Sequence, residues 1–378
     1  MGKRNFKFTK GGFRYVGLLT LLVNPLLPSL SGAVDINNST GLDVSITSVF
    51  QEANFFKDLS GSQGKGSTAV DIGINFHPTD EDEAQITLSF AAGNGLKQTF
   101  ANKGFSLMPN ADDLEDDLKN INGRNRDYLL EAWYKHTFTV RGWKIAPTVG
   151  IIDATAYIDT NDYANDETTQ FMNDAFVNNP LAELPSYDLG GVLDISRKNL
   201  DFKVLVMNTK NDDGKDYDYY TAQVEYSGDN TSAVKGNYRL YYWRTSKDFT
   251  NYKGQKDYKE GVGFSGDRNL EGNVGLFSRL GFNTHTDTGD FKSFVSGGFT
   301  YSGWRVLNKP TELGVGLGYL SGNKKVSGIK SVKVGEVYYK LYVNGFASLT
   351  LDVQYQEQKN VVGSIGAWVY GVRLNATF

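Results

Sequence analysis

The last stretch of the chain, AWVYGVRLNATF (367–378), has two faces with opposite chemistry. Side chains alternate between the two sides of a β-strand, so every second residue shares a face. One face would be small or polar and includes Arg373 and Asn375. The opposite face would carry only apolar and aromatic residues, namely Trp368, Tyr370, Val372, Leu374, Ala376 and Phe378. Aromatic residues at both ends of an apolar row are typical of a strand that spans a bilayer.

The opposite end of the chain has the pattern of a cleaved export signal. Basic residues up to Arg14 precede an uncharged apolar stretch, 15–30, and Ser31-Gly32-Ala33 supplies small residues for cleavage. Two prolines interrupt the apolar stretch, which is also shorter than the roughly 20 residues of a membrane-spanning helix. We therefore expect removal of residues 1–33 and one folded domain over 34–378.

Composition and charge exclude several classes of protein. Asp and Glu (43) outnumber Lys and Arg (39), which argues against nucleic acid as a partner. The absence of Cys excludes disulfides, thiolate metal sites and Cys nucleophiles. The mean hydropathy of −0.39 is low for a helical membrane protein, but barrel strands hide their apolar residues in alternate positions.

Two-faced alternation recurs along the chain. It predicts strands at 43–50, 70–76, 86–90, 127–138, 145–151, 187–196, 200–209, 217–227, 234–245, 271–283, 291–303, 311–321, 333–343, 347–356 and 365–378. Because an antiparallel single-chain barrel needs an even number of strands, this set is one short, and we expect about 16. The predicted fold is an all-β transmembrane antiparallel β-barrel wide enough to enclose an aqueous channel. A large soluble β-sandwich is the alternative.

Three long irregular stretches, 94–126, 153–185 and 246–270, contrast with tight turns such as 197–199, as expected for long extracellular loops and short periplasmic turns. Within the first, the acidic run ADDLEDDLKN (111–120) predicts a short helix with a solvated face. In the strand 127–138, the alternation places Leu130, Ala132, Tyr134 and His136 toward lipid.

Several segments carry a resemblance to a known family. They are EAW (131–133), the irregular stretch 150–180, GNVGLFSRLGF (272–282), SGGFTYSGW (296–304), TELGVGLGYLSG (311–322), GEVYYKLYV (335–343), LTLDVQYQ (349–356) and YGVRLNATF (370–378). Together they resemble the carbohydrate-selective outer-membrane porins of the OprB type over most of residues 127–378. The resemblance implies a barrel in the bacterial outer membrane, a pore narrowed by a loop, passage of monosaccharides, and a homotrimer embedded in outer-membrane lipid.

Inward-facing residues are candidates for contacting a solute. Arg supplies a rigid fork of donors, carboxylates accept hydrogen bonds from hydroxyl groups, and aromatic rings suit the apolar face of a sugar. Arg279 is the leading candidate because it also lies in a family-like segment, LFSRLGF. The other candidates are Glu131, Trp133, Lys135, Arg239, Tyr241, Trp243 and Asp352. Each is equally compatible with an ordinary lumen residue surrounded by water. Arg373 is also inward-facing, but we expect it near the periplasmic rim.

The polar turn Asp159-Thr160-Asn161-Asp162 predicts that residues 153–180 fold into the barrel and narrow it, with Asp159, Asn161 and Asp162 as residues of this constriction loop. Calcium binding by these residues is the alternative. The EF-hand pattern fails because Ala164 stands where that motif needs Gly.

The sequence thus predicts a passive diffusion channel for small hydrophilic solutes, with sugars preferred by resemblance and no cofactor or metal. A general or ion-preferring porin without a sugar site is the first alternative, and a plugged structural barrel is another. An outer-membrane hydrolase is a remote alternative, because the histidines His77, His136 and His285 are scattered and no G-x-S-x-G motif occurs.

Overall fold

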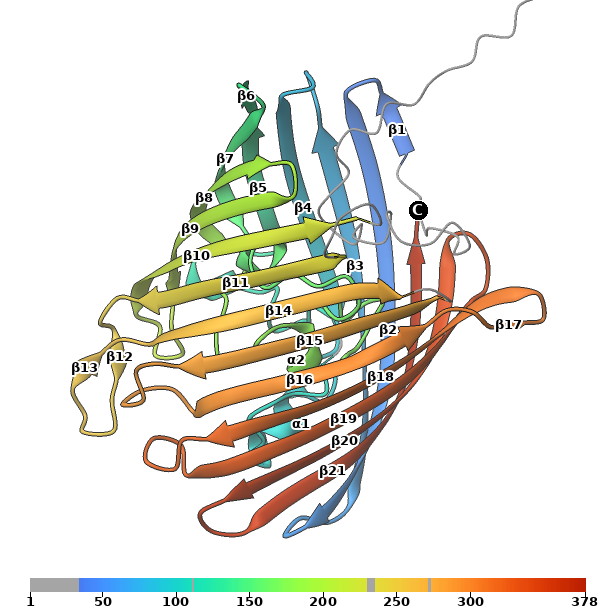
Figure 1. Cartoon of the computed structure of the whole chain (residues 1–378). Helices are drawn as coiled ribbons and strands as arrows, with labels where there is room; N and C mark the ends of the chain where they lie inside the picture. The colour runs from blue at the N-terminus through green and yellow to red at the C-terminus, as the bar shows by residue number, and fades with distance from the viewer. Residues whose placement is uncertain (1–33, 111, 230–234, 271–272) are drawn as a thin grey trace, which may run out of the picture.

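The computed structural model describes residues 34–110, 112–229, 235–270 and 273–378, so the predicted signal segment 1–33 lies outside the described residues. Figure 1 shows a barrel of strongly inclined strands. The strands are β1 Val34–Asn37, β2 Thr40–Lys57, β3 Ser62–Phe76, β4 Asp82–Ala92, β5 Leu129–His136, β6 Phe138–Val140, β7 Trp143–Ile152, β8 Asp188–Arg197, β9 Leu200–Lys210, β10 Asp216–Gly228, β11 Gly236–Thr245, β12 Phe249–Thr250, β13 Lys256–Asp257, β14 Glu260–Leu270, β15 Val274–Asn283, β16 Phe291–Tyr301, β17 Arg305–Val306, β18 Lys309–Gly322, β19 Ile329–Tyr342, β20 Ala347–Asn360 and β21 Ser364–Thr377.

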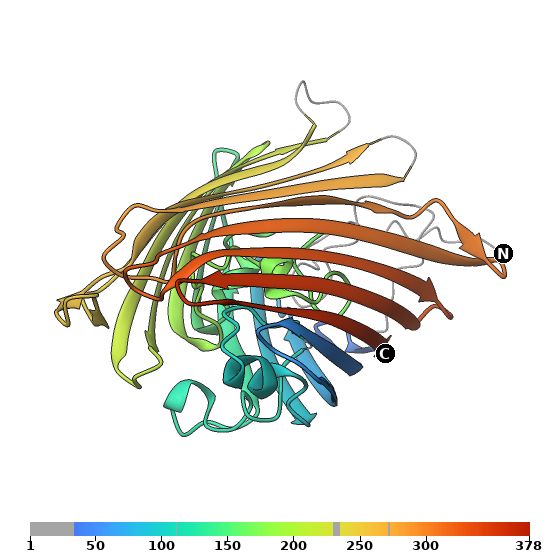
Figure 2. The same ribbon diagram turned by 90° about the horizontal axis from the view of Figure 1, so that it is seen from below.

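A closed ring of 16 antiparallel strands forms the barrel, as the alternation predicts. Each barrel strand pairs with the next in chain order, and β2 pairs with β21 from Ser45↔Thr377 to Lys57↔Ile365 to close the ring. The shorter strands are additions to this ring: β1 pairs with β2, β6 continues β5 along β7, β17 pairs with β18, and β12 and β13 form a separate ribbon. Figure 2 shows the same barrel from below, with the C-terminal strands running lengthwise across the view.

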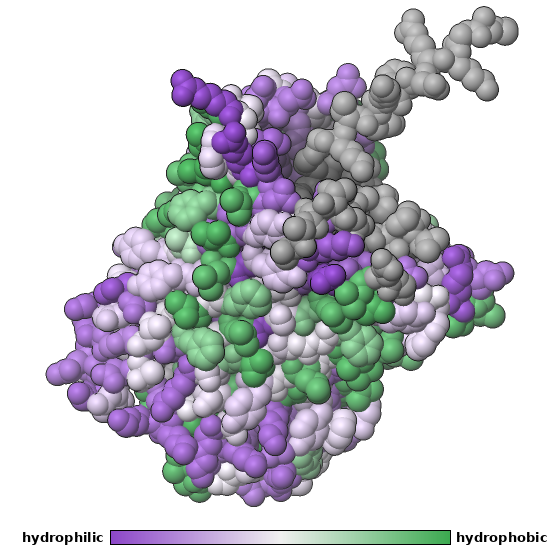
Figure 3. Space-filling view, in the orientation of Figure 1, coloured by the Kyte–Doolittle hydropathy of each residue, from purple (hydrophilic) through white to green (hydrophobic). Residues whose placement is uncertain are grey.

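The two faces of the barrel wall differ as the terminal strand predicts. On β21, Trp368, Tyr370 and Val372 are exposed on the outside, whereas Arg373 and Asn375 are buried on the inside. Figure 3 shows hydrophobic residues spread over the outer face between hydrophilic ends. A wall whose outer face carries an apolar band and whose inner face is polar is the pattern of a barrel that spans a membrane. No helix within the described residues is long and apolar enough to cross a bilayer.

The sequence prediction missed one strand, β14, and placed its residues in the loop 246–270. The outward apolar row of β14 is short, because Val262 and Phe264 are followed on the same face by Gly266 and Arg268, while Gly261 and Gly263 lie on the inward face. A Cβ atom at Gly261 would lie 2.8 Å from Cζ2 of Trp243, and one at Gly263 would overlap the ring of Tyr241. These inward glycines therefore make room for bulky residues of the neighbouring strand.

Two long connections leave the barrel at the end opposite the chain termini and turn inward. We call residues 94–128, between β4 and β5, the second inner segment; it contains the helix α1 Lys97–Asn102 and the short 3₁₀ helix Ile121–Gly123. We call residues 153–187, between β7 and β8, the inner loop; it contains the 3₁₀ helix Ala154–Ala156 and the helix α2 Asp174–Val177. Figure 1 shows α2 behind β15 and β16, inside the ring.

Two predictions in this region were wrong. The run 111–120 does not form a helix over its described residues, because its backbone bonds elsewhere: Glu115 N donates to Gly93 O, and Asp116 N donates to Asn94 Oδ1. Leu130, expected to face lipid, is buried in a cluster with Leu118 and Ile121 of the second inner segment. A register irregularity in the pairing of β4 with β5, between Thr87 and Leu88, interrupts the alternation there.

Candidate functional site

Arg279 on β15 holds the inner loop against the barrel wall. Its Nε lies 3.0 Å from Oδ2 of Asp159, and its NH1 donates to the carbonyl of Phe176 at 2.6 Å. Its NH2 donates to the carbonyl of Asp159 and to Oδ1 of Asn165. The side chain is 0% exposed. The structure therefore places the leading solute-contact candidate beneath the loop, where its donors serve the loop backbone.

The predicted constriction residues also turn toward the wall. Asp159 Oδ2 accepts a second hydrogen bond, from Asn179 N at 2.7 Å. Asn161 donates to Oγ of Ser265 on β14, and Oδ2 of Asp162 accepts from Asn237 on β11. These residues therefore anchor the loop at separate points of the wall. Among the described residues, no group of His, Asp or Glu side chains is arranged to hold a metal ion.

The far half of the inner loop is held by two residues that the sequence prediction missed, Glu336 and Lys340, and by Arg373, which it placed near the rim. Glu336 on β19 accepts hydrogen bonds from the backbone N–H groups of Met172 (2.6 Å) and Asn173 (2.9 Å). Arg373 on β21 donates to the carbonyls of residues 167 and 170, so it binds the loop rather than standing at the rim as expected. Lys340 donates to a further loop carbonyl, that of residue 169. The partners are backbone atoms, which leave no pattern in the sequence.

Glycines on the inner wall leave space for the side chains of the inner loop. A Cβ atom at Gly316 would lie 2.9 Å from Cε1 of Phe176, and one at Gly371 would lie 3.1 Å from Cε of Met172. One at Gly275 would overlap the ring of Tyr163. The alternate glycines of GVGLG (314–318) are a sequence signal for this close approach, since glycine in a strand often marks a site where another backbone comes near.

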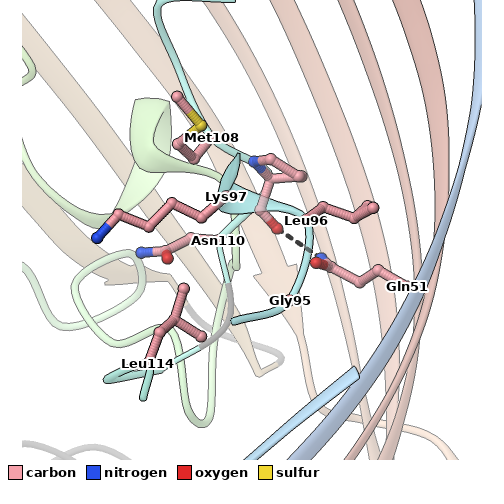
Figure 4. Close-up of a pocket in the computed structure, with 8 residues that line it drawn as sticks. Gln51, Gly95, Leu96, Lys97, Met108, Asn110 and Leu114 are labelled. Carbon is pink, nitrogen blue, oxygen red and sulfur yellow. Dashed lines mark hydrogen bonds between the residues drawn. The ribbon is translucent and has the colours of Figure 1, made fainter. Parts of the chain in front are cut away.

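The second inner segment is held by a row of glutamines on β20. Gln354, Gln356 and Gln358 occupy alternate positions and donate to the carbonyls of Pro109 (3.4 Å), Leu107 (3.1 Å) and Gly104 (2.9 Å). We call these three residues the glutamine row. Gln51 on β2 donates to the same carbonyl of Pro109, beside a small pocket that Figure 4 shows lined by Leu96, Lys97, Met108, Asn110 and Leu114.

The two inner segments also bind one another. Met108 N donates to Oδ2 of Asp174 at 2.7 Å, and Asp174 N donates to Met108 O at 3.2 Å. Burial raises the pKa of Asp174 to about 6, although the Met108 N–H opposes this shift. The inner loop and the second inner segment therefore form one body joined to the wall.

The remaining predicted residues of β11 are buried as well. Arg239 pairs with Asp267 at 2.5 Å and with Glu225 at 3.0 Å, both on neighbouring strands. Tyr241 accepts a hydrogen bond from Asn179 of the inner loop at 2.8 Å. Trp243 lies parallel to the ring of Tyr219, with centroids 6.3 Å apart. This stretch of wall is occupied by the loop and by its own ion pairs.

The structure places three predicted residues together on β5. Glu131 accepts a hydrogen bond from Thr87 Oγ1 at 3.3 Å, and Lys135 Nζ lies 5.8 Å from the ring centroid of Trp133. Lys135 also forms an ion pair with Glu83 and is partly exposed. Asp352 lies apart from them on β20, where it accepts a hydrogen bond from Gln354.

Carboxyl groups gather beside the inner loop where it faces β3 and β5. The acidic cluster, as we call it, consists of Asp71, Asp112, Asp113, Asp153, Asp166 and Glu167, all partly exposed. Burial and the nearby carboxylates of Asp166 and Asp153 raise the pKa of Glu167 to about 8. Burial and the charges of Asp71 and Glu167 also raise the pKa values of Asp112 and Asp113. No Lys or Arg forms an ion pair with a member of this cluster among the described residues.

Comparisons with known proteins agree with this architecture. Among solved structures, a low-pH structure of OprB from Pseudomonas putida superposes with a TM-score of 0.55 at 12% identity, covering 90% of this chain and 93% of that one. A mutant porin of Rh. blastica gives a TM-score of 0.48 at 9% identity, over 88% of this chain and 99% of that one. No family model matches the sequence.

The predicted resemblance to the OprB type is confirmed at the level of the fold. A protein of Aquifex aeolicus described as uncharacterized is 34% identical over 319 residues, which cover 83% of this chain and 90% of that protein. The chain therefore has the 16-stranded porin fold and belongs to the same family as this Aquifex aeolicus protein.

Proposed function

We propose that the protein is a passive diffusion channel for small hydrophilic solutes in the bacterial outer membrane. The observation that carries the proposal is a polar inner wall partly covered by two segments that enter from one end. The inner loop bonds to β10, β11, β14, β15 and β19–β21. The partly exposed acidic cluster lies where the loop faces β3 and β5, which is where we place the water-filled path.

Swelling of proteoliposomes in neutral solutes of graded size tests this proposal. A diffusion channel with a fixed constriction predicts fast swelling in small solutes, slow swelling in larger ones and no requirement for an energy source. A folded protein that admits none of the solutes would contradict it.

We further propose that sugars are preferred, as the resemblance to the OprB type suggests. Because Arg279, Tyr241 and Trp243 are occupied by the inner loop or buried beneath it, we assign solute contact to the partly exposed Lys135 on β5. Glu131 and Trp133 on the same face are buried, and Trp133 packs in the same cluster as Trp243, so we give neither a direct contact. Lys135 offers a cation that can donate hydrogen bonds to the hydroxyl groups of a sugar.

Titration of the single-channel current with glucose tests the sugar site. We expect saturable block that weakens in Lys135→Gln. Replacement of an exposed lysine near the start of β7, Lys144→Gln, should leave the block unchanged. A stable current that glucose does not block would contradict the sugar preference but would still support the diffusion channel.

A second candidate, a cation-preferring channel, is favoured by the acidic cluster. Carboxylates along a narrow path raise the local concentration of cations and repel anions. The reversal potential across a KCl gradient should therefore show preference for K⁺. At a pH above the pKa of Glu167, about 8, the preference should fall in Glu167→Gln and persist in Asp212→Asn, which removes an exposed acid from the turn between β9 and β10. Equal permeability of K⁺ and Cl⁻ would contradict this candidate.

A homotrimer is proposed from the family resemblance, and light scattering of the detergent-solubilised protein tests it. The hydrolase alternative is disfavoured by the placement of two histidines, because His136 bonds Asp82 at 2.7 Å and His285 bonds Asp257 at 3.0 Å in separate parts of the barrel.

A further inference from the structure

Two neighbouring tight turns carry basic residues at the end of the barrel that holds the chain termini. Arg141 and Gly142 close the β6–β7 hairpin, directly between the paired residues Val140 and Trp143. Lys198 and Asn199 close the β8–β9 hairpin in the same way. Arg141 and Lys198 have positive φ angles of 51° and 54°, as tight hairpin turns require. Because β7 pairs with β8, the two turns are adjacent on the rim.

A third cation stands on the outer face beside an aromatic ring. The guanidinium carbon of Arg197 lies 5.2 Å from the ring centroid of Trp143, which is 40% exposed. Phe138 and Val140 are also exposed on the outward face of this hairpin. Figure 3 shows strongly hydrophilic residues at the tip of the hairpin and hydrophobic residues directly below it. The arrangement therefore straddles the border between the apolar band and the polar end of the barrel.

The charges in this group are not balanced by acids. We call Arg141, Arg197 and Lys198 the basic rim. None of the three forms an ion pair within the described part of the chain. The adjacent β3–β4 turn carries Asp80 and Glu81, which form no ion pair with the basic rim either. Three uncompensated cations beside an exposed Trp leave a surface that suits an anion with an apolar tail.

We propose that the basic rim and Trp143 bind the phosphate headgroup of an anionic phospholipid in the leaflet at this end of the barrel. Guanidinium groups match phosphate oxygens with paired donors, and Trp occupies the headgroup level of a bilayer. Basic residues next to a membrane attract anionic lipids over about one Debye length. A free phosphate ion would satisfy the cations but would leave Trp143, Phe138 and Val140 without an apolar partner, which favours lipid as the occupant.

Association of spin-labelled lipids with the reconstituted full-length chain tests this proposal. The protein is placed in phosphatidylcholine vesicles, and electron paramagnetic resonance compares the motionally restricted fraction of labelled phosphatidylglycerol with that of labelled phosphatidylcholine. We expect preference for phosphatidylglycerol in the unaltered protein. In Arg141→Gln/Arg197→Gln/Lys198→Gln the preference should fall by at least about threefold, because each cation near an anionic surface contributes a factor of roughly five.

The matched control removes the same charge at the opposite end, by Lys247→Gln/Lys324→Gln/Lys325→Gln, and should keep the preference. If the triple variant of the basic rim does not refold, Arg141→Gln/Lys198→Gln alters only exposed turn positions and should lose part of the preference. The proposal would be overturned if the unaltered protein showed no lipid preference, or if the control variant lost the preference equally. It would also be overturned if inorganic phosphate, added at unchanged ionic strength, abolished the preference, because that result would indicate a site for free phosphate.

Discussion

At the scale of single residues, buried cations of the inner wall act as loop anchors. Arg279 combines an ion pair to Asp159 with hydrogen bonds to the backbone of the inner loop. Arg373 adds two further bonds to loop carbonyls. A guanidinium group suits this task because its fixed fork of donors satisfies several carbonyls at once. We propose that these residues set the width of the channel through the loop they hold.

Replacement of Arg279 by Ala should release the inner loop. It leaves Asp159 buried without its partner, which should lower the free energy of unfolding by about 3–5 kcal/mol. The single-channel current should become larger and noisier as the loop moves. Arg239→Ala is the control, because it breaks an equally buried ion pair whose partners, Glu225 and Asp267, lie on strands. An unchanged current in Arg279→Ala would contradict the anchoring role.

The raised pKa of Glu167, about 8, makes ion selectivity depend on pH. Below that pKa the carboxyl is neutral, and above it the carboxyl is charged. The preference for K⁺ over Cl⁻ should therefore increase between about pH 6 and about pH 9. Since the folded-state pKa lies above the ordinary value, folding is favoured at low pH, and this contribution is lost as pH rises toward about 8. Reversal potentials measured across this range should flatten in Glu167→Gln; an identical pH profile in the variant would contradict the assignment.

At the scale of elements, strands follow local alternation, whereas the inner segments follow contacts that only the closed barrel creates. β21 could be predicted with both faces correct, because its pattern is complete within the strand itself. β14 could not, because its outward apolar row contains only Val262 and Phe264 before Gly266 and Arg268. The sequence predicted that residues 153–180 fold inward, but not that Asp159, Asn161 and Asp162 bond to the wall. The inward course of 94–128 had no local signal in the sequence. The glutamine row donates its hydrogen bonds to backbone carbonyls of this segment, and every residue has such a carbonyl.

The glutamine row should control the position of the second inner segment. Gln354→Ala/Gln356→Ala/Gln358→Ala removes the donors to the carbonyls of Pro109, Leu107 and Gly104. Each lost hydrogen bond costs roughly 0.5–1.5 kcal/mol, so the segment should detach before the barrel unfolds. Limited proteolysis should then cleave within residues 94–128 in the variant and spare the unaltered protein. Thr87→Ala is the control, because it removes a bond between two wall residues.

At the scale of the whole molecule, one closed wall supports two separate surfaces. The outer face carries the apolar band and the basic rim, and the inner face carries the anchors of two segments that enter from the same end. The segments bind each other through Met108 and Asp174, so they are expected to move as a unit. Side chains on many strands join the inner segments to the wall, so we expect any narrowing of the channel by these segments to depend on the complete barrel.

The current through single molecules of the refolded protein in a planar bilayer tests the central claim most directly. A water-filled barrel narrowed by fixed inner segments predicts discrete current steps of one size that rise linearly with voltage. It also predicts larger steps when residues 157–179 of the inner loop are replaced by a short Gly-Ser linker. A folded, inserted protein that conducts no ions in either form would contradict the account and leave a barrel closed along its length.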